Sequence, residues 1–193
     1  MKKFELTNEF VTNMFGTKLF RIRALVEFGD VEAGELGGYV EKESNLGHDD
    51  NAWVYDNAWV YGNARVYGDA QVSGDARVYG NARVCGDALV CGNARVCSDA
   101  LVCGNARVCS DEDYAYAHGF GSVNRTTTFF RLKDGGVGVR CGCFYGTLAQ
   151  FRDKIRETHG ETKKAQEYLM LADLMELRFE EDENEVGNRK YVE

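Results

Sequence analysis

Residues 51–110 read NAWVYD NAWVYG NARVYG DAQVSG DARVYG NARVCG DALVCG NARVCS DALVCG NARVCS. Each six-residue unit has Val at its fourth position, from Val54 to Val108, and Ala two residues earlier. A period of six fits neither an α-helix nor an ordinary meander of strands. Because side chains alternate along a strand, Ala and Val face one side, and the third and fifth residues of the unit face the other. The pattern therefore predicts a β-solenoid.

The corners and the core of this solenoid follow from the same unit. Gly followed by Asn or Asp, as at Gly68 and Asp69, tolerates the positive φ of a sharp corner. Three units close a triangular coil of 18 residues. Coils stacked about 4.8 Å apart place Val over Val in a dry axial column. Each buried Val stabilises the fold by about 1.5–3 kcal/mol, so we expect a polar residue in this column to be strongly destabilising.

The repeat can be extended upstream, and other segments flank it. Val40 and Leu46 are six residues apart, and a two-residue bulged corner at 47–50 brings them into register, which gives twelve rungs or four coils. Residues 1–38 have the composition of a β-hairpin or α+β cap, which an open solenoid end requires. The repeat fails at Glu112 and Tyr114. We therefore predict a mainly β chain with a cap over 1–38, a β-helix over 39–111, a linker over 112–125, a ββαα module over 126–180 and an acidic tail over 181–193.

The ββαα module has its own local signals. Strands are predicted over 126–132 and 137–144, with a Gly-containing hairpin turn at 133–136 between them. Thr147 and Gln150 form a capping box for a helix over 148–159, which Gly160 closes. A second helix is predicted over 162–179, with an apolar stripe typical of core packing.

The repeat resembles the hexapeptide-repeat proteins that form a left-handed parallel β-helix. The resemblance covers residues 51–111 and implies the left-handed winding. It leaves function open, because that family includes acyltransferases, γ-class carbonic anhydrases and proteins without known chemistry. A narrower resemblance, carried by residues 23–40 and then Trp53-Val54-Tyr55, is to repeat proteins common in phages and prophages, some of them labelled polymer-forming.

The cysteines of the repeat predict free thiols. Cys85, Cys91, Cys97, Cys103 and Cys109 all occupy the outward fifth position of the unit, so only Cys85/Cys103 and Cys91/Cys109 stack. Strand spacing of about 4.8 Å is wider than the roughly 3.8 Å between Cβ atoms that a disulfide prefers. A zinc site would need four converging ligands, which three faces of a prism do not supply. We predict no metal site.

Sorting the outward residues by face gives a candidate interaction surface. It combines an aromatic cluster near the first coils, two outward leucines and a stacked arginine pair: Trp53, Tyr55, Trp59, Tyr61, Tyr67, Leu89, Leu101, Arg77 and Arg95, to which we add the acids Glu181, Asp182 and Glu183 of the tail. Large exposed apolar groups are rarely left wet. Either the flanking segments or a second subunit cover them, or they dock another protein. The arginines either hold phosphates or lie over Tyr and pair with corner Asp.

Enzymatic interpretations find little support in the sequence. A hexapeptide acyltransferase is expected to use a histidine base, and a γ-class carbonic anhydrase uses three histidines around zinc. The chain has only His48, His118 and His159, none of them in the repeats. No phosphate loop or dinucleotide fingerprint is present. We predict no catalytic, cofactor-binding or metal-binding residues.

Composition sets the remaining expectations. The chain has a formal net charge of −8 and no proline, and it lacks an apolar run or a secretory segment, so we expect a soluble cytoplasmic protein. The charge disfavours direct nucleic-acid binding. We predict that the chain is a non-catalytic recognition scaffold and that it forms a homo-oligomer, either a dimer or a trimer. From the phage-type resemblance, it is expected to inhibit or sequester a bacterial host protein, such as a CRISPR effector. The alternatives are a nucleotide-signal sponge, a structural repeat protein and an acyltransferase.

Overall fold

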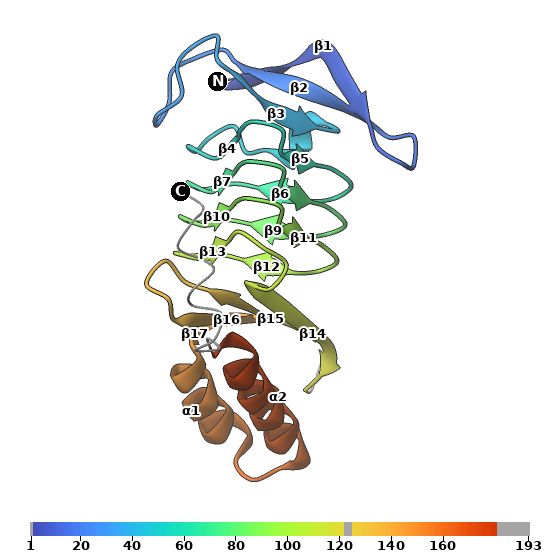
Figure 1. Ribbon diagram of the computed structural model, residues 1–193. Helices are drawn as coiled ribbons and strands as arrows, with labels where there is room; N and C mark the ends of the chain where they lie inside the picture. The colour runs from blue at the N-terminus through green and yellow to red at the C-terminus, as the bar shows by residue number, and fades with distance from the viewer. Residues whose placement is uncertain (1, 122–124, 181–193) are drawn as a thin grey trace.

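The chain folds into a β-solenoid of about four turns between two end pieces (Figure 1). The computed structural model describes residues 2–121 and 125–180. An antiparallel hairpin covers the first turn, and a sheet with two helices covers the last. The ten repeat strands are β4 (Trp53–Val54), β5 (Trp59–Val60), β6 (Arg65–Val66), β7 (Gln71–Val72), β8 (Arg77–Val78), β9 (Arg83–Val84), β10 (Leu89–Val90), β11 (Arg95–Val96), β12 (Leu101–Val102) and β13 (Arg107–Val108).

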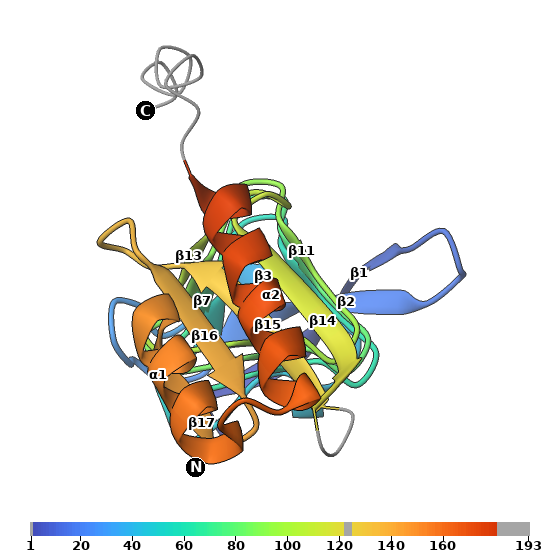
Figure 2. The same ribbon diagram turned by 90° about the horizontal axis from the view of Figure 1, so that it is seen from below.

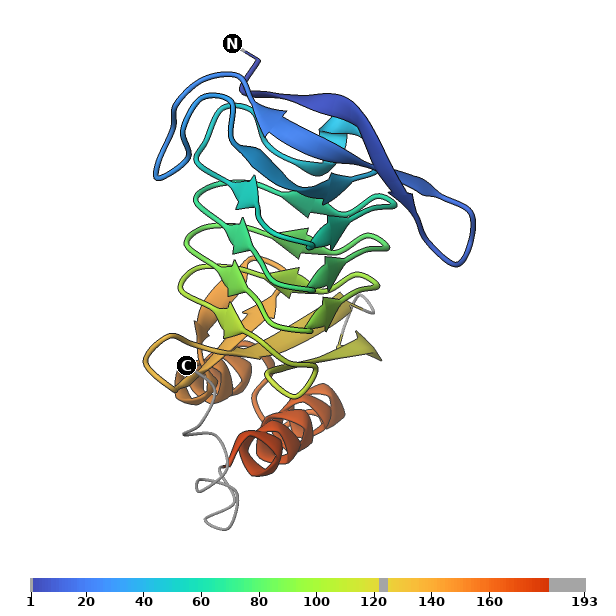
Figure 3. The same cartoon turned by 45° about the horizontal axis from the view of Figure 1, so that its top comes forward.

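Three parallel sheets form the walls of the solenoid, as the 18-residue spacing predicts (Figure 3). One wall has the order β13-β10-β7-β4, the second β12-β9-β6, and the third continues β5-β8-β11. Every valine from Val54 to Val108 is fully buried in the shared core. At the corners Gly68 has φ 75°, and a Cβ on it would lie 2.8 Å from the backbone nitrogen of Gly86 in the next turn. Glycine is therefore required there by both conformation and space.

The upstream extension of the repeat is confirmed. Val40 pairs with Val60 in β5, and Leu46 forms a parallel bridge with Val66 in β6. A short 3₁₀ helix, η1 (Glu43–Asn45), precedes Leu46. The buried amide of Asn45 donates to the carbonyl oxygens of Gly62 and Ala64 at 3.2 and 2.8 Å. This side chain thus satisfies carbonyl groups that the incomplete first turn leaves without a strand partner.

The N-terminal cap is a β-hairpin that joins one wall of the solenoid. Strands β1 (Phe4–Thr12) and β2 (Lys18–Ala24) are antiparallel, and β3 (Leu36–Val40) pairs with β2 on one side and β5 on the other. The resulting sheet has the order β1-β2-β3-β5-β8-β11. The solenoid edge is therefore covered by continuing the sheet, and the boundary expected after residue 38 falls inside β3.

The C-terminal module has four strands, where the sequence analysis expected two. Its elements are β14 (Tyr114–Phe120), β15 (Arg125–Arg131), β16 (Val137–Cys141), β17 (Phe144–Thr147), α1 (Leu148–His159) and α2 (Lys163–Phe179). The expected linker at 112–125 is thus occupied largely by β14. Both helices and the capping box at Thr147 are confirmed. Helices α1 and α2 lie on the face of this sheet away from the solenoid (Figures 1 and 2).

The sheet of this module closes the solenoid because it is buried on both faces. Phe130 and Leu132 belong to the core of the solenoid, whereas Phe129 belongs to the core between sheet and helices. Tyr114, which replaces the valine of the repeat, is buried at the end of the solenoid core. An extra strand is needed here because the last turn would otherwise expose apolar side chains to water. This need explains why residues 114–120 do not form a free linker.

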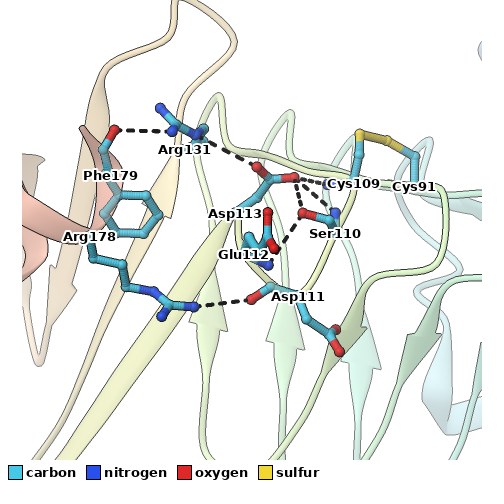
Figure 4. Close-up of polar contacts among 9 residues, drawn as sticks. All are labelled: Cys91, Cys109, Ser110, Asp111, Glu112, Asp113, Arg131, Arg178 and Phe179. Carbon is cyan, nitrogen blue, oxygen red and sulfur yellow. Dashed lines mark hydrogen bonds and ion pairs between the residues drawn. A yellow bond between two sulfur atoms is a disulfide. The ribbon is translucent and has the colours of Figure 1, made fainter. Parts of the chain in front are cut away.

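Polar contacts tie the last turn to the module (Figure 4). The Asp113 carboxylate accepts hydrogen bonds from the backbone N–H groups of Cys109 and Ser110 at 2.9 and 2.8 Å, and from the Ser110 hydroxyl at 3.1 Å. It also pairs with Arg131 at 3.7 Å, and Arg131 donates to the carbonyl oxygen of Phe179 at 3.0 Å. The solenoid end, β15 and the end of α2 are thereby linked through the Asp113–Arg131 pair.

The expectation of free thiols is wrong for one stacked pair. Cys91 and Cys109 are joined by a disulfide, with their Cα atoms 4.3 Å apart. The corner of the last turn brings these atoms closer than the strand spacing of about 4.8 Å on which the expectation relied. Cys85, Cys97 and Cys103 are free thiols, as expected, and Cys141 and Cys143 of the module are free as well.

Candidate recognition surface

The structure divides the predicted aromatic cluster into a buried part and an accessible part. Trp53 is fully buried: the rings of Phe4 and Phe28 meet it edge-on at 6.2 and 5.3 Å. Tyr55 is half-buried and packs against the same core. The alternative in which flanking segments cover the aromatic residues is therefore correct for Trp53. Trp53 does not belong to the candidate interaction surface.

The two outward leucines also differ from each other. Leu101 packs against the solenoid core, and its backbone N–H donates to the Thr128 hydroxyl of the C-terminal module at 3.0 Å. Leu89 is half-buried on β10, between Gln71 and Arg107 of the adjacent strands. Leu101 is thus part of the junction with the module, and Leu89 stays on an outer wall.

An aromatic and cationic column runs along the wall that continues the cap. We call Tyr39, Trp59, Arg77 and Arg95 the Trp59 column, because they pair in register on β3, β5, β8 and β11. The guanidinium carbon of Arg77 lies 4.5 Å from the centre of the Trp59 ring, a cation–π contact. Trp59 and Arg77 are half-buried and Arg95 is exposed. The paired strands therefore hold the large side chains of the column in fixed positions on this wall.

The top of the column is fixed by polar contacts from the cap. The Tyr39 hydroxyl accepts a hydrogen bond from Arg21 and donates one to Glu9, both at 3.0 Å. The Arg21 guanidinium also lies 5.3 Å from the centre of the Tyr39 ring. Tyr39 is absent from the predicted interaction surface because it precedes the regular repeat. Val40 was already predicted to lie on a rung, and this register places the neighbouring Tyr39 on the outer face of the same wall.

A corner of the solenoid adds two stacked tyrosines beside the column. The rings of Tyr61 and Tyr79 lie 5.2 Å apart and nearly parallel, with 4° between their planes. Burial, followed by hydrogen bonding to Cys97, raises the pKa of Tyr79 to about 12. Burial also raises the pKa of Tyr61. Both phenols are therefore neutral near pH 7, and the Tyr79 hydroxyl is already engaged by Cys97.

The hairpin between β1 and β2 projects beyond the solenoid on the side of this wall (Figures 1 and 2). We call residues 13–17 the hairpin tip. Its side chains Met14 and Phe15 are 86% and 80% exposed. The Asn13 side chain fixes the turn by accepting hydrogen bonds from the backbone N–H groups of Phe15 and Thr17 at 2.9 and 3.0 Å. The sequence predicted a β-hairpin or α+β cap over residues 1–38 without these exposed apolar residues, which the adjacent Met14 and Phe15 could have indicated.

The hairpin and the column border one hollow of about 400 Å³. Its lining residues are Val11, Tyr39, Asn57, Trp59, Asp75 and Arg77. Among the residues that the structure describes, neither Arg77 nor Arg95 forms an ion pair. Arg77 lies over an aromatic ring, as one alternative of the sequence analysis held, but the ring is Trp59. The Asp75 carboxylate lines the same hollow and partly offsets the charge of Arg77 there. The exposed Arg95 lies outside this lining, and its guanidinium is available to an acidic group from outside the chain.

The other stacked arginine pair has a different environment. Arg65 and Arg83 pair in register on β6 and β9 and border a hollow of about 520 Å³. The same hollow is lined by Glu43, Asp49 and Asp50, together with His48 and Tyr67. These carboxylates would repel a phosphate. The geometry therefore gives no specific support to the nucleotide-sponge alternative at this pair.

The three histidines lie in separate places and have structural contacts. The His48 ring stacks on Phe4 at 4.4 Å, and the His118 ring is 2.9 Å from the Thr126 hydroxyl. His159 lies at the end of α1. Across residues 2–121 and 125–180, no three His, Cys, Asp or Glu side chains converge as metal ligands would. The acids Glu181, Asp182 and Glu183 lie outside the described residues.

Comparison with known families agrees with the solenoid. Two overlapping stretches, residues 58–74 and 70–86, match the family model described as YdcK Beta solenoid repeat. The chain is similar to that repeat over part of its solenoid. No curated protein matches the chain. In the part that the structure describes, no helix is long and apolar enough to span a membrane. The resemblance to hexapeptide and phage-type proteins stays a prediction.

Proposed function

We propose that the chain is a non-catalytic recognition scaffold that binds an acidic region of a partner protein through the hairpin tip and the Trp59 column. The observation that carries the proposal is the exposed Arg95 next to Arg77, which lies over Trp59, with no ion pair from a described carboxylate to either guanidinium group. The Asp111 carboxylate accepts a hydrogen bond from the backbone N–H of Arg95 at 2.7 Å and leaves its guanidinium free of an ion pair. Met14 and Phe15 supply exposed apolar side chains at the tip of the hairpin whose Val11 borders the same hollow as Trp59 and Arg77. Aromatic residues, Met and Arg are the residue types enriched in protein interfaces.

The solenoid suits this role because its binding side chains are held in place before a partner arrives. Trp59 and Arg77 extend from strands that pair on both sides, and the valines beneath them are fully buried. Binding to such a wall orders few additional groups, so less of the interaction free energy is lost to conformational entropy. Affinity then depends on a few central side chains. We expect Trp59, Arg77 and Arg95 to be those residues.

The partner class that we propose is a bacterial host protein, whose activity the chain would inhibit or sequester. This part of the proposal rests on the phage-type resemblance of residues 23–40, and a defence protein such as a CRISPR effector is one such target. Recognition of an acidic surface would make association salt-dependent, because screening weakens attraction between exposed charges. Turnover of acetyl-CoA by the purified chain would contradict the proposal that the scaffold is non-catalytic.

A capture experiment with two matched arginine pairs tests the surface. The full chain is immobilised, bacterial lysate is passed over it at low salt, and the retained protein is identified and its affinity measured. Arg77→Gln with Arg95→Gln should weaken binding at least about tenfold, since each pairing with an exposed or partly buried charge contributes on the order of 1 kcal/mol. Arg65→Gln with Arg83→Gln removes the same charges from another wall and should leave binding unchanged. An equal loss of affinity for the captured protein in both double variants would contradict the proposed surface.

We also propose that the chain forms a dimer through α2. Met170, Leu174 and Leu177 are 71%, 54% and 67% exposed, and their spacing of four and three places them on one helix face. Lys163 begins the same face seven residues before Met170. Antiparallel packing of two copies would bury these three apolar side chains against their counterparts in the second copy. This arrangement is isologous, which favours the dimer over the trimer.

A further inference from the structure

The C-terminal module contains a cavity of about 270 Å³ that is separate from the proposed recognition surface. It lies among α1, the beginning of α2, and the turn between β16 and β17. Phe144, Phe151 and Tyr168 contribute aromatic rings to its lining, and Arg125, Lys154 and His159 contribute basic groups. No carboxylate lines this cavity, although the chain has 31 acids against 23 Lys and Arg. Its charge is therefore opposite in sign to that of the chain.

The aromatic side of the cavity is held by packing and is uncharged. The Phe151 ring lies 5.4 Å from Phe144 and 5.8 Å from Tyr168, the latter edge-on. The Tyr168 hydroxyl donates to the carbonyl oxygen of Phe120 at 3.2 Å. Burial, together with Cys141, raises the pKa of Tyr168 to about 12, so this phenol carries no charge near pH 7. These three rings offer a hydrophobic surface against which the ring of a ligand can pack.

The basic groups have few partners within the chain. Among the described residues, Arg125 forms no ion pair, and its guanidinium lies over Gly142, where a Cβ would be 1.8 Å from Nη1. Lys154 pairs with Glu157 at 2.7 Å, but both side chains are more than half exposed, so this pair contributes little. A planar guanidinium at the rim of an apolar cavity is suited to bidentate binding of a carboxylate.

We propose that this cavity binds a small aromatic carboxylate, with the ring against Phe151 and the carboxylate on Arg125 and Lys154. The cavity is slightly below the roughly 300–1,000 Å³ of sites for drug-sized ligands, which limits the ligand to about ten non-hydrogen atoms. A ligand of that size with ordinary efficiency binds with a Kd on the order of 0.1 mM. This site goes beyond protein recognition by the solenoid and depends on none of its residues.

Calorimetric titration of the full chain with 3-phenylpropionate tests the proposal. The acid should bind, and 3-phenylpropan-1-ol, which has the same ring without the charge, should bind at least about tenfold more weakly. Arg125→Met retains most of the side-chain stem, removes the guanidinium at an exposed position, and should weaken binding of the acid by about tenfold or more. Lys154→Met is the second variant and should weaken it in the same direction.

The matched control is Lys164→Met, which removes a positive charge from α2 outside the cavity lining. It should leave the affinity for 3-phenylpropionate unchanged, which excludes a general effect of net charge. Thermal unfolding of each variant shows whether the module is intact. Equal affinity for the acid and the alcohol, no binding of the acid, or unchanged binding by both Arg125→Met and Lys154→Met would overturn the proposal.

Discussion

At the scale of single residues, the solenoid places a buried side chain next to an exposed one. Val72 is fully buried in the core, whereas the preceding Gln71 is exposed on the same two-residue strand. The alternation of the strand explains the difference, and the 18-residue stacking repeats it at every turn. Stability should therefore depend sharply on which of two adjacent positions is changed.

Substitution of these neighbours by threonine tests this dependence. Val72→Thr keeps the shape of the side chain but buries a hydroxyl group, and it should lower the free energy of unfolding by about 1–3 kcal/mol. Gln71→Thr should change it by no more than about 0.5 kcal/mol. Urea unfolding followed by circular dichroism measures both. Similar values for the two variants would contradict the assignment of inward and outward faces.

The stacked tyrosines predict loss of stability at high pH. The pKa of Tyr79 is about 12 in the folded chain and 10 is its ordinary value. Between these values the unfolded chain releases a proton that the folded chain retains, so the contribution present below pH 10 is lost as pH rises toward 12. Tyr79→Phe should make the free energy of unfolding fall less steeply between pH 10 and pH 12, as measured by urea unfolding at several pH values. An unchanged slope would contradict the assigned pKa.

At the scale of elements, the joint between solenoid and module depends on Asp113. Its carboxylate and the Arg131 guanidinium that it faces are only 15% and 16% exposed. Asp113→Asn should destabilise this joint by about 1–3 kcal/mol, because the buried arginine loses its charge partner. Faster hydrogen exchange in β14 and β15 would report the loosening. Asp153→Asn, at an exposed pair in α1, is the control and should leave exchange in those strands unchanged.

The elements also show what could be predicted from sequence. The repeat and the capping box are local patterns, and both led to correct elements. Strand β14 was missed, although Tyr114, Tyr116 and Phe120 fall on alternating positions of a period-two pattern that could have found it. Burial of Trp53 depends on Phe4 and Phe28, which are distant in sequence, so no local pattern reported it. The disulfide likewise depends on a corner geometry that the ideal strand spacing does not contain.

At the scale of the whole molecule, the solenoid separates two surfaces with different expected partners. The hairpin tip lies at the cap and the Trp59 column runs along one wall from β3 to β11, whereas α2 lies beyond the last turn (Figure 1). A dimer formed through the exposed face of α2 would use none of the side chains of the hairpin tip or the Trp59 column. Two linked copies also raise the effective concentration of the second site when a partner offers two acidic regions.

The dimer is tested by the molar mass of the purified chain. Sedimentation of the wild-type chain should give twice the monomer mass, and Leu174→Lys should shift the equilibrium toward monomer by about 100-fold or more, because the apolar burial of Leu174 is lost in both copies. Leu36→Lys introduces the same side chain at a 49% exposed leucine of the cap, and it should leave the dimer intact. A monomeric or trimeric wild-type chain, or an unaffected Leu174→Lys dimer, contradicts pairing through α2. Since Leu174 is already 54% exposed, its replacement tests association with little effect on folding.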